Sequence, residues 1–244
     1  MTNNALVIGG NGGIAQAIIK QLCANSEYQA VIVLSRSHPQ DKSLFQQFSH
    51  VSWIVIDSLD EEAVDAQVKQ WQSDGMTFST IISTVGVLHA GSIKPEKRLE
   101  DISINSLMSY FQINTLVNAQ WLKVAPKILN KQKAVFVVLS ARVGSISDNQ
   151  LGGWYGYRAS KAALNMLMKT ASVEYKRRMP NTVLVCYHPG TVDTDLSKPF
   201  QANVKPEKLF TPEFTASQLL SFLPALNNDP NIHYIDWQGQ SIHW

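Results

Sequence analysis

The chain has 244 residues, of which 45% are hydrophobic and 16% charged, and its formal net charge is +2. The ordinary apolar content excludes a disordered chain, while a charged fraction below the roughly 25% of an average soluble domain indicates a sparsely charged surface. The small positive excess is too weak for a nucleic-acid-binding surface, and the basic run at 176–178 is better explained as a helix end.

Short apolar runs rich in β-branched residues alternate with helical patterns along the chain. Strands are predicted at 4–9, 30–35, 51–56, 78–83, 134–140, 182–187 and 232–235. Continuous apolar runs, without polar alternation, are typical of strands that are covered on both faces. Helices are predicted at 13–24, 60–71, 99–130 and 154–178, and a late one begins near 212.

Two short patterns mark helix starts, and the order of the elements indicates the fold. Ser58 with Glu61 predicts a capping box before the second helix, and Thr211 followed by Pro212 predicts the start of the late one. Repeated strand–helix order implies a parallel sheet, and no linker divides the chain. We predict an α/β protein: a single-domain Rossmann fold over 1–244, with a doubly wound parallel sheet of about seven strands and helices on both faces.

A glycine-rich turn follows the first strand. Gly10-x-Gly12-x-x-Ala15 matches the dinucleotide-binding fingerprint in its G/A form. Glycines let the backbone approach a pyrophosphate, whose charge then meets the free N–H groups of the helix that starts near Gly13. A merely flexible turn is the alternative, but the order of strand, glycines and helix favours a dinucleotide site.

The end of the second strand indicates which dinucleotide is bound. An acidic residue there would bind a free ribose 2′-hydroxyl, but this chain has Ser35 and Arg36. A guanidinium suits a 2′-phosphate, so NADP(H) is preferred and NAD(H) stays possible. The alternative for Arg36 is an ordinary surface charge.

A second informative pattern places Tyr157 and Lys161 four residues apart on a predicted helix. This spacing puts the phenol and the ammonium on one face, where the cation would lower the phenol pKa toward neutrality. An isolated pair of this kind is weak evidence, because most such pairs are surface decoration.

Three motifs in order make the pair more informative. The glycine turn, the run 157–161 and the segment 189–194 together resemble the short-chain dehydrogenase/reductase family over essentially the whole chain. The segments 140–146 and 236–244 are most similar to the C-factor and sniffer-type carbonyl reductase branch. This resemblance implies a hydride transfer between NADP(H) and a small-molecule carbonyl or secondary alcohol.

The resemblance also implies roles for individual residues. Tyr157 would be the general acid/base, Lys161 would lower its pKa and hold the nicotinamide ribose, and Asn114 would hold a water of the proton relay. Asp57 would bind adenine, or it could simply end its strand. Cofactor contacts are implied for Gly9, Gly10, Asn11, Gly12, Gly13, Ile14, Ser35, Arg36, Asp57, Gly86, Tyr157, Lys161, Pro189, Gly190, Val192 and Thr194.

One departure from the family pattern affects the catalytic serine. The family ends its fifth strand in Ser-Ser and uses the second hydroxyl, where this chain has Ser140 and Ala141. Because a strand alternates its faces, Ser140 cannot replace its neighbour without a change of register. Ser140 is preferred on the motif, and Ser145 is the rival.

Two functions therefore stay open: a reductase, or a dinucleotide-binding signalling protein, similar to C-factor, with weak or vestigial activity. The segment 196–210 is expected to form a substrate lid, and the family implies a homodimer or homotetramer. Lys20 is the first basic residue, so neither a secretory signal nor a membrane span is expected. Cys23 and Cys186 lie in apolar runs without zinc-ligand spacing, which predicts no metal site and a reducing, cytoplasmic location.

Overall fold

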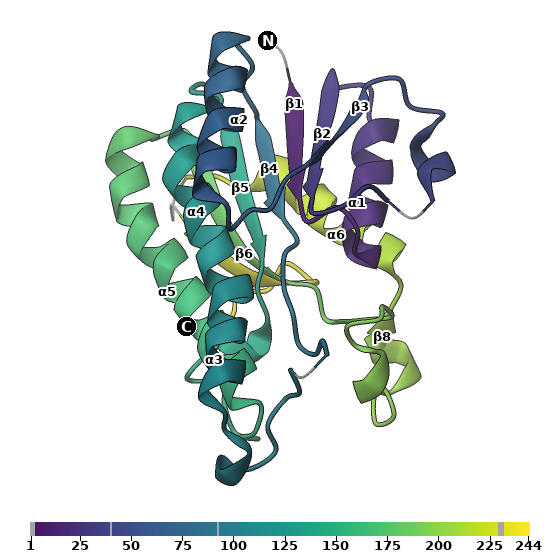
Figure 1. Cartoon of the computed structure of the whole chain (residues 1–244), viewed down its shortest axis with the longest axis vertical. Coiled ribbons are helices and arrows are strands. Elements are labelled where there is room, and N and C mark those ends of the chain that lie inside the picture. Colours follow the sequence, from purple (N-terminus) through teal and green to yellow (C-terminus); the bar gives the residue numbers. More distant parts are fainter. Residues whose placement is uncertain (1–2, 40, 92, 229–231) are drawn as a thin grey trace.

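Seven parallel strands form the central sheet of the computed structural model, which describes residues 3–39, 41–91, 93–228 and 232–244. The strand order is β3-β2-β1-β4-β5-β6-β9 (Figure 1). Their bounds are β1 Asn4–Ile8, β2 Ala30–Ser35, β3 Val51–Val55, β4 Thr80–Ser83, β5 Ala134–Leu139, β6 Thr182–His188 and β9 Ile232–Asp236.

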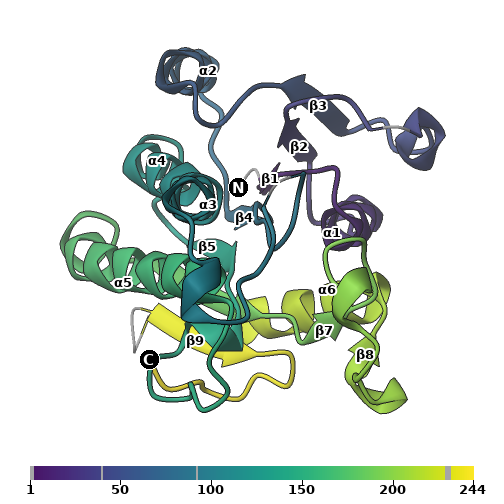
Figure 2. The same cartoon turned by 60° about the horizontal axis from the view of Figure 1, so that its bottom comes forward.

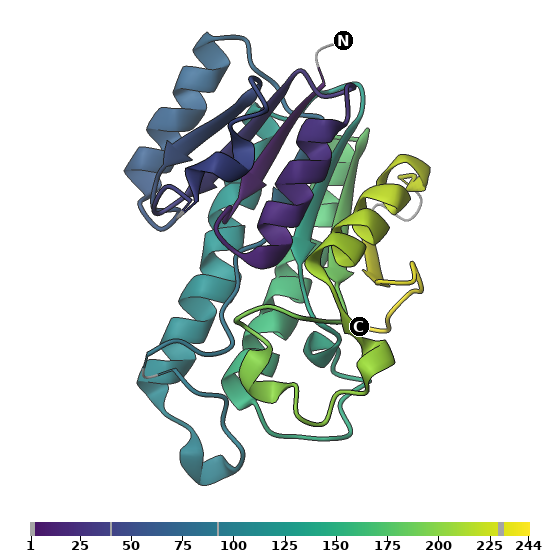
Figure 3. The same ribbon diagram turned by 90° about the vertical axis from the view of Figure 1, so that its right-hand side faces the viewer.

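Helices cover both faces of this sheet (Figure 2). Helices α1 (Gly13–Ala24) and α6 (Pro212–Phe222) lie side by side on one face, as the view in Figure 3 shows. The other face is covered by α2 (Glu61–Ser73), α4 (Val117–Val124) and α5 (Tyr155–Arg178), and α3 (Ile104–Phe111) leads into α4. Alternate residues of the strands pack into two buried apolar clusters, one on each face of the sheet. The predicted fold class is confirmed.

The strand order reverses beside β1, which pairs with β2 on one side and with β4 on the other. In open parallel sheets, ligands bind in the crevice at such a switch point, outside the carboxyl ends of the strands. The loops that follow β1, β4, β5 and β6 gather at this end of the sheet, at the bottom of Figure 1. The motif-bearing segments of the sequence are therefore brought to one edge.

Several element ends differ from the predictions. The N-cap of α2 is Asp60, whose side chain accepts the N–H of Ala63, so the capping box predicted at Ser58 is wrong. Ser58 instead accepts a hydrogen bond from the indole of Trp121 at 2.9 Å. The late helix does begin as predicted, with Thr211 accepting the N–H of Phe214.

The region 99–130 is not one helix. It contains a short turn (Leu99–Asp101), α3, a π-helical segment (Gln112–Leu116), α4 and a further turn (Ala125–Lys127). A small two-stranded sheet, β7 (Thr191–Val192) with β8 (Leu209–Phe210), was not predicted. Within the described ranges, no helix has the combination of length and apolar character that a membrane span needs.

Candidate functional site

The glycine turn after β1 is shaped to approach a ligand closely. Gly9 has φ +93°, and a Cβ on Gly10 would lie 2.2 Å from Cγ1 of Val33, so neither position accepts a side chain without rearrangement. Gly12 is the N-cap of α1 and offers no side-chain cap to the first N–H groups of the helix. These donors and the positive end of the helix dipole form a site for an anion such as a phosphate.

The end of β2 lies beside this turn, because the amide of Asn11 donates to Ser37 at 2.9 Å. The Ser35 hydroxyl is taken up by protein partners: it accepts from the indole of Trp53 at 2.7 Å and donates to the Ser37 carbonyl. Arg36 is exposed and makes no hydrogen bond or ion pair with the described residues. Its guanidinium is therefore free to meet an anionic group.

Asp57 follows β3, and its carboxylate accepts the N–H of Leu59 at 3.0 Å. This local bond turns the chain after the strand, which fits the strand-ending alternative for this residue. This turn uses one carboxylate oxygen of Asp57. The adenine contact implied for this residue stays a prediction.

One cavity of about 210 Å³ joins the glycine turn to the Tyr157–Lys161 pair. Among the residues with predicted roles, the cavity is lined by Asn11, Gly12, Gly13, Ile14, Gly86, Ser140, Tyr157, Lys161, Pro189 and Thr194. Leu196, the first residue of the predicted lid, lines it as well, and so do four residues that sequence reasoning missed: Thr84, Val85, Leu139 and Asp195. Eight residues with predicted roles lie outside the lining: Gly9, Gly10, Ser35, Arg36, Asp57, Asn114, Gly190 and Val192.

The Tyr157–Lys161 pair lies on the first two turns of α5, and both side chains are buried. The Lys161 ammonium donates to the carbonyl oxygen of Leu139 at 2.8 Å and lies 5.9 Å from the centre of the Tyr157 ring. Gly86 leaves room for this ammonium, because a Cβ there would lie 3.2 Å from Nζ. A helix and two strand ends thus hold the pair in place.

Burial controls the protonation of both groups. It raises the pKa of the Tyr157 phenol, with smaller contributions from Tyr110 and Tyr234. It also lowers the pKa of Lys161 to about 8, because a charged ammonium is poorly solvated there. These protein groups therefore do not produce the lowered phenol pKa that the sequence led us to expect. They keep the phenol protonated.

Asn114 lies in the π-helical segment and is fully buried. Its side chain accepts the N–H of Val87 at 2.7 Å and donates to the Val87 carbonyl and the Ser160 hydroxyl, each at 3.0 Å. It therefore ties the loop after β4 to α5. The backbone carbonyl of Asn114 accepts a hydrogen bond from the side-chain amide of Asn118 at 2.9 Å. The water contact implied for Asn114 stays a prediction.

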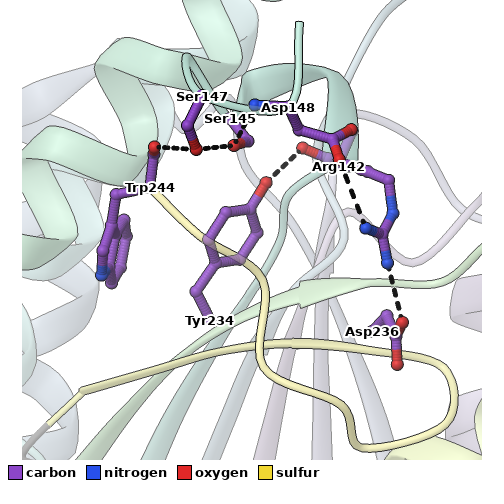
Figure 4. A network of polar contacts seen from close by, with 8 residues as sticks. Arg142, Ser145, Ser147, Asp148, Tyr234, Asp236 and Trp244 are labelled. Atoms are coloured by element: carbon purple, nitrogen blue, oxygen red, sulfur yellow. Dashed lines mark hydrogen bonds and ion pairs between the residues drawn. The ribbon is translucent and has the colours of Figure 1, made fainter.

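The residues after β5 show where each candidate hydroxyl lies. Ser140 donates to Oδ1 of Asn165 on α5 at 2.6 Å. Ala141 packs in an apolar cluster with Tyr157. Figure 4 shows Ser145 turned toward Ser147, whose hydroxyl donates to the backbone carbonyl of Trp244. The hydroxyls of both candidates, Ser140 and Ser145, are therefore hydrogen-bonded to other protein groups.

The same figure shows how the C-terminal strand fixes this loop (Figure 4). The Tyr234 hydroxyl donates to the Ala141 carbonyl at 2.7 Å, and Arg142 forms ion pairs with Asp236 at 2.8 Å and Asp148 at 3.6 Å. Asp236 is buried, whereas the Arg142 side chain is 41% exposed, so the pair lies at the edge of the protein interior. The backbone beside Tyr157 is held from two sides.

The segment after β6 forms a further part of the cavity wall. Gly190 has φ +77°, and a Cβ on Gly13 would lie 3.1 Å from Cγ2 of Thr194, so this segment packs close to the glycine turn. The Asp195 carbonyl lies 3.0 Å from Nε2 of His89. The Phe200 ring packs on Trp154 with a centroid distance of 5.2 Å. The predicted lid region therefore contacts the wall around Tyr157.

Glu96 has a structural role that no sequence pattern indicated. It is 2% exposed, and its carboxylate accepts the N–H of Gly156 in the first turn of α5 at 3.1 Å. Its backbone carbonyl accepts the N–H of Trp154, a residue with φ 54°. Since the residue that caps α5 lies 60 positions upstream, only the tertiary structure reveals it.

Comparisons with known proteins agree with this geometry. Residues 3–205 match the family model described as short chain dehydrogenase. The C-signal protein of Myxococcus xanthus is 33% identical over 106 residues, which cover 43% of this chain and 58% of that protein. Two solved structures share the fold over the whole chain. They are the carbonyl reductase Sniffer of D. melanogaster (TM-score 0.87, 23% identity, all of that chain) and an NADPH-bound carbonyl reductase from chicken fatty liver (TM-score 0.85, 22% identity, 99% of that chain).

Proposed function

Because the chain belongs to the short-chain dehydrogenase family, we propose that it is an NADPH-dependent reductase of a small apolar carbonyl compound. The observation that carries this proposal is the shared cavity: the glycine turn and the Tyr157–Lys161 pair line the same hollow. A dinucleotide whose pyrophosphate lies on the turn would extend toward the phenol. The NADPH bound in one of the similar structures and the carbonyl reductase activity in both names support the same assignment.

The residues of the turn fit a dinucleotide. The backbone at Gly9 and Gly10 leaves no room for side chains, and the uncapped start of α1 supplies N–H donors for the phosphates. The free Arg36 guanidinium would hold a 2′-phosphate, which favours NADPH over NADH. When bound, reduced nicotinamide supplies the hydride.

Tyr157 supplies the proton. Its raised pKa keeps the phenol protonated, so it can donate to the oxygen of a substrate carbonyl as that oxygen gains negative charge. The Lys161 ammonium, anchored on the Leu139 carbonyl, supplies a positive charge near the same point. A phenol that holds its proton favours the direction of carbonyl reduction.

The wall around the phenol favours an apolar substrate. Val87, Leu88, Tyr110 and Ala141 form a buried cluster with Tyr157. Trp154 and Phe200 pack against this cluster and against each other. We therefore assign the segment 196–210 as the lid over the substrate within a single domain.

Family membership also supports proposals about the assembly of the protein and its location. We assign a homodimer or homotetramer, in which second copies cover apolar residues that α3 and α5 expose. Cys23 and Cys186 are free and buried, which suits a reducing compartment such as the cytoplasm.

A fluorescence titration with NADPH, combined with turnover on a panel of ketones, aldehydes and quinones, tests the proposal. We expect NADPH to bind more tightly than NADH and at least one apolar carbonyl compound to be reduced. NADPH binding without any turnover would favour the signalling alternative, and absence of NADPH binding would overturn both functions.

A further inference from the structure

A tyrosine of the last strand reaches the backbone that follows β5. Tyr234 on β9 is 3% exposed, and its hydroxyl donates to the Ala141 carbonyl at 2.7 Å (Figure 4). Burial raises the pKa of this phenol to about 12, so the group keeps the proton that it donates. The tyrosine lies 93 positions from its acceptor, so this contact exists only in the folded chain.

Two contacts tie the turn that begins at Ala141 to β9. The Ala141 carbonyl accepts the N–H of Gly144 at 2.8 Å, which closes the turn, and the same oxygen accepts the Tyr234 hydroxyl. Arg142 pairs with Asp236 at 2.8 Å, but its side chain is partly exposed, and ion pairs open to solvent contribute little. The buried bond from Tyr234 is therefore the firmer of the two contacts.

This turn, residues 141–144, packs directly against α5. A Cβ on Gly144 would lie 2.9 Å from both the carbonyl carbon and the Cβ of Lys161, so only a glycine allows this approach without rearrangement. The Lys161 ammonium donates to the Leu139 carbonyl at 2.8 Å, just before the turn. The segment 139–144 thus holds Lys161 at its backbone and at its charged end.

Asn165 joins this segment one helical turn further along α5. Its amide nitrogen donates to the Gly144 carbonyl at 3.3 Å, and its amide oxygen accepts the Ser140 hydroxyl at 2.6 Å. Residues four apart share one face of a helix, so Lys161 and Asn165 belong to the face of α5 that rests on this segment. A displacement of the segment would therefore shift Lys161 relative to Tyr157.

We propose that Tyr234 is a positioning residue for the Tyr157–Lys161 pair, because its hydroxyl fixes the turn against which Lys161 packs. The inference rests on the proposed reductase function. Tyr234 is not among the described residues that line the cavity, so it acts through Lys161 and not on substrate or cofactor. Because a misplacement of about 1 Å can cost on the order of 10²-fold in rate, loss of this hydroxyl should slow turnover. The glycine turn lies outside these contacts, so binding of the dinucleotide should persist.

Two substitutions of tyrosine by phenylalanine separate positioning from stability. Tyr234→Phe removes only the hydroxyl, and the ring keeps its place beside Trp244, with a centroid distance of 5.1 Å. Tyr175→Phe is the matched control, because Tyr175 is also buried and donates to the Leu122 carbonyl at 2.8 Å. It lies about 20 Å beyond Lys161 along α5, at ~1.5 Å per residue. Both variants lose one buried bond from a phenol to a backbone carbonyl, so the control shows what that loss does to the fold alone.

Steady-state kinetics of the full chain with NADPH and a carbonyl compound that the wild type reduces test the inference. We expect Tyr234→Phe to lower kcat at least tenfold while the KM for NADPH changes less than threefold. Tyr175→Phe should change neither value more than threefold. Gly144→Ala, which pushes the turn away from Lys161, should also lower kcat at least tenfold, and it decides if Tyr234→Phe does not fold.

Hydrogen exchange measures the turn itself and needs no turnover. The N–H groups of Gly144 and Ser145 are bonded to the carbonyls of Ala141 and Arg142. Once the turn is released from β9, these bonds should open more often, so we expect both amides to exchange at least fivefold faster in Tyr234→Phe. The control variant should exchange there at the wild-type rate.

Three results would overturn the inference. They are a loss of kcat below tenfold in Tyr234→Phe, equal losses of kcat in Tyr234→Phe and Tyr175→Phe, or unchanged exchange at the turn. A wild type that binds NADPH but reduces no carbonyl compound would instead refute the proposed function. The exchange measurement would then decide alone whether Tyr234 holds the turn.

Discussion

The Lys161 ammonium is buried and has one hydrogen-bond partner, the Leu139 carbonyl, among the described residues. Burial lowers its pKa to about 8, so the group loses its charge at a much lower pH than an exposed lysine. We expect the reductive kcat/KM to be constant at neutral pH and to fall as the pH rises through about 8, approaching tenfold per pH unit. A pH–rate profile between pH 6 and 10 measures this, and a rate that stays flat to pH 10 would contradict it.

The same burial makes Lys161 costly for stability. Its folded pKa lies below that of the unfolded chain, so the unfolded state binds more protons between about pH 8 and 10.5, and stability rises with pH across that window. Lys161→Met removes the charge at similar volume and should raise the free energy of unfolding at pH 7 by about 1–3 kcal/mol while activity is lost. Urea denaturation of both proteins measures the difference. A less stable variant would show that the ammonium is a net stabilising group.

Arg36 determines the choice of dinucleotide in this account. Arg36→Glu replaces the free guanidinium with a negative charge that repels a 2′-phosphate and can bind a 2′-hydroxyl. We expect the Kd for NADPH to rise about 10- to 100-fold, a loss of about 1.4–2.8 kcal/mol, while NADH binding weakens less or improves. Fluorescence titrations with both cofactors decide, and equal losses for both would make Arg36 an ordinary surface charge.

Sequence reasoning located the parts of the site that depend on neighbours in the chain. The spacing of Tyr157 and Lys161 on a helix and the glycine turn are local properties, and the cavity joins them. The phenol pKa could not be predicted, because burial by Tyr110 and other distant residues controls it. Glu96 was missed for the same reason, since its partner Gly156 is brought close only by the fold.

At the scale of elements, the start of α5 depends on Glu96. Its carboxylate accepts a first-turn N–H and lies at the positive end of the helix dipole. We expect Glu96→Ala to lower the free energy of unfolding by about 1–2 kcal/mol, and Glu96→Gln to lower it less because the amide oxygen still accepts. Glu100→Gln, an exposed change in the same loop, is the control in urea denaturation. Equal stability of Glu96→Ala and wild type would refute the cap.

Helix and strand positions were largely predictable, because periodicity and caps are local. Helix α1 begins and ends as predicted, and α6 begins as predicted after Thr211. The π-helical segment between α3 and α4 was not predicted. Its distinguishing contacts, from Asn114 to Val87 and Ser160, join it to a distant loop and helix. The β7–β8 pair also escaped prediction, since two-residue strands leave no pattern.

At the scale of the molecule, the sparse charge of the sequence corresponds to apolar side chains that remain on the surface of two helices. Ile104 and Met108 on α3 are 69% and 65% exposed, and Met166 and Val173 on α5 are 64% and 61% exposed. Leu164 and Met168 point the other way, into the core. Because α3 and α5 are in contact with each other, a second copy of the chain could cover exposed apolar residues of both helices, as the proposed homodimer or homotetramer requires.

Combined substitution of Met108→Lys and Met166→Lys tests that assembly. Burying two unpaired ammonium groups between subunits is costly, so we expect the variant to sediment as a monomer while the wild type sediments as a dimer or tetramer. Leu151→Lys introduces the same group at a 93% exposed loop position outside these helices and should leave the assembly unchanged. A wild type that sediments as a monomer at micromolar concentration would contradict the prediction.

The central claim is that the buried Tyr157 phenol delivers the proton in an NADPH-dependent reduction. Tyr157→Phe removes one oxygen from a packed ring, so the fold and the glycine turn remain intact. The decisive measurement is the rate of NADPH oxidation by this variant with a substrate of the wild type, alongside its Kd for NADPH. We predict that the rate falls at least 100-fold while the Kd changes less than threefold. A variant that keeps the wild-type rate would contradict the account.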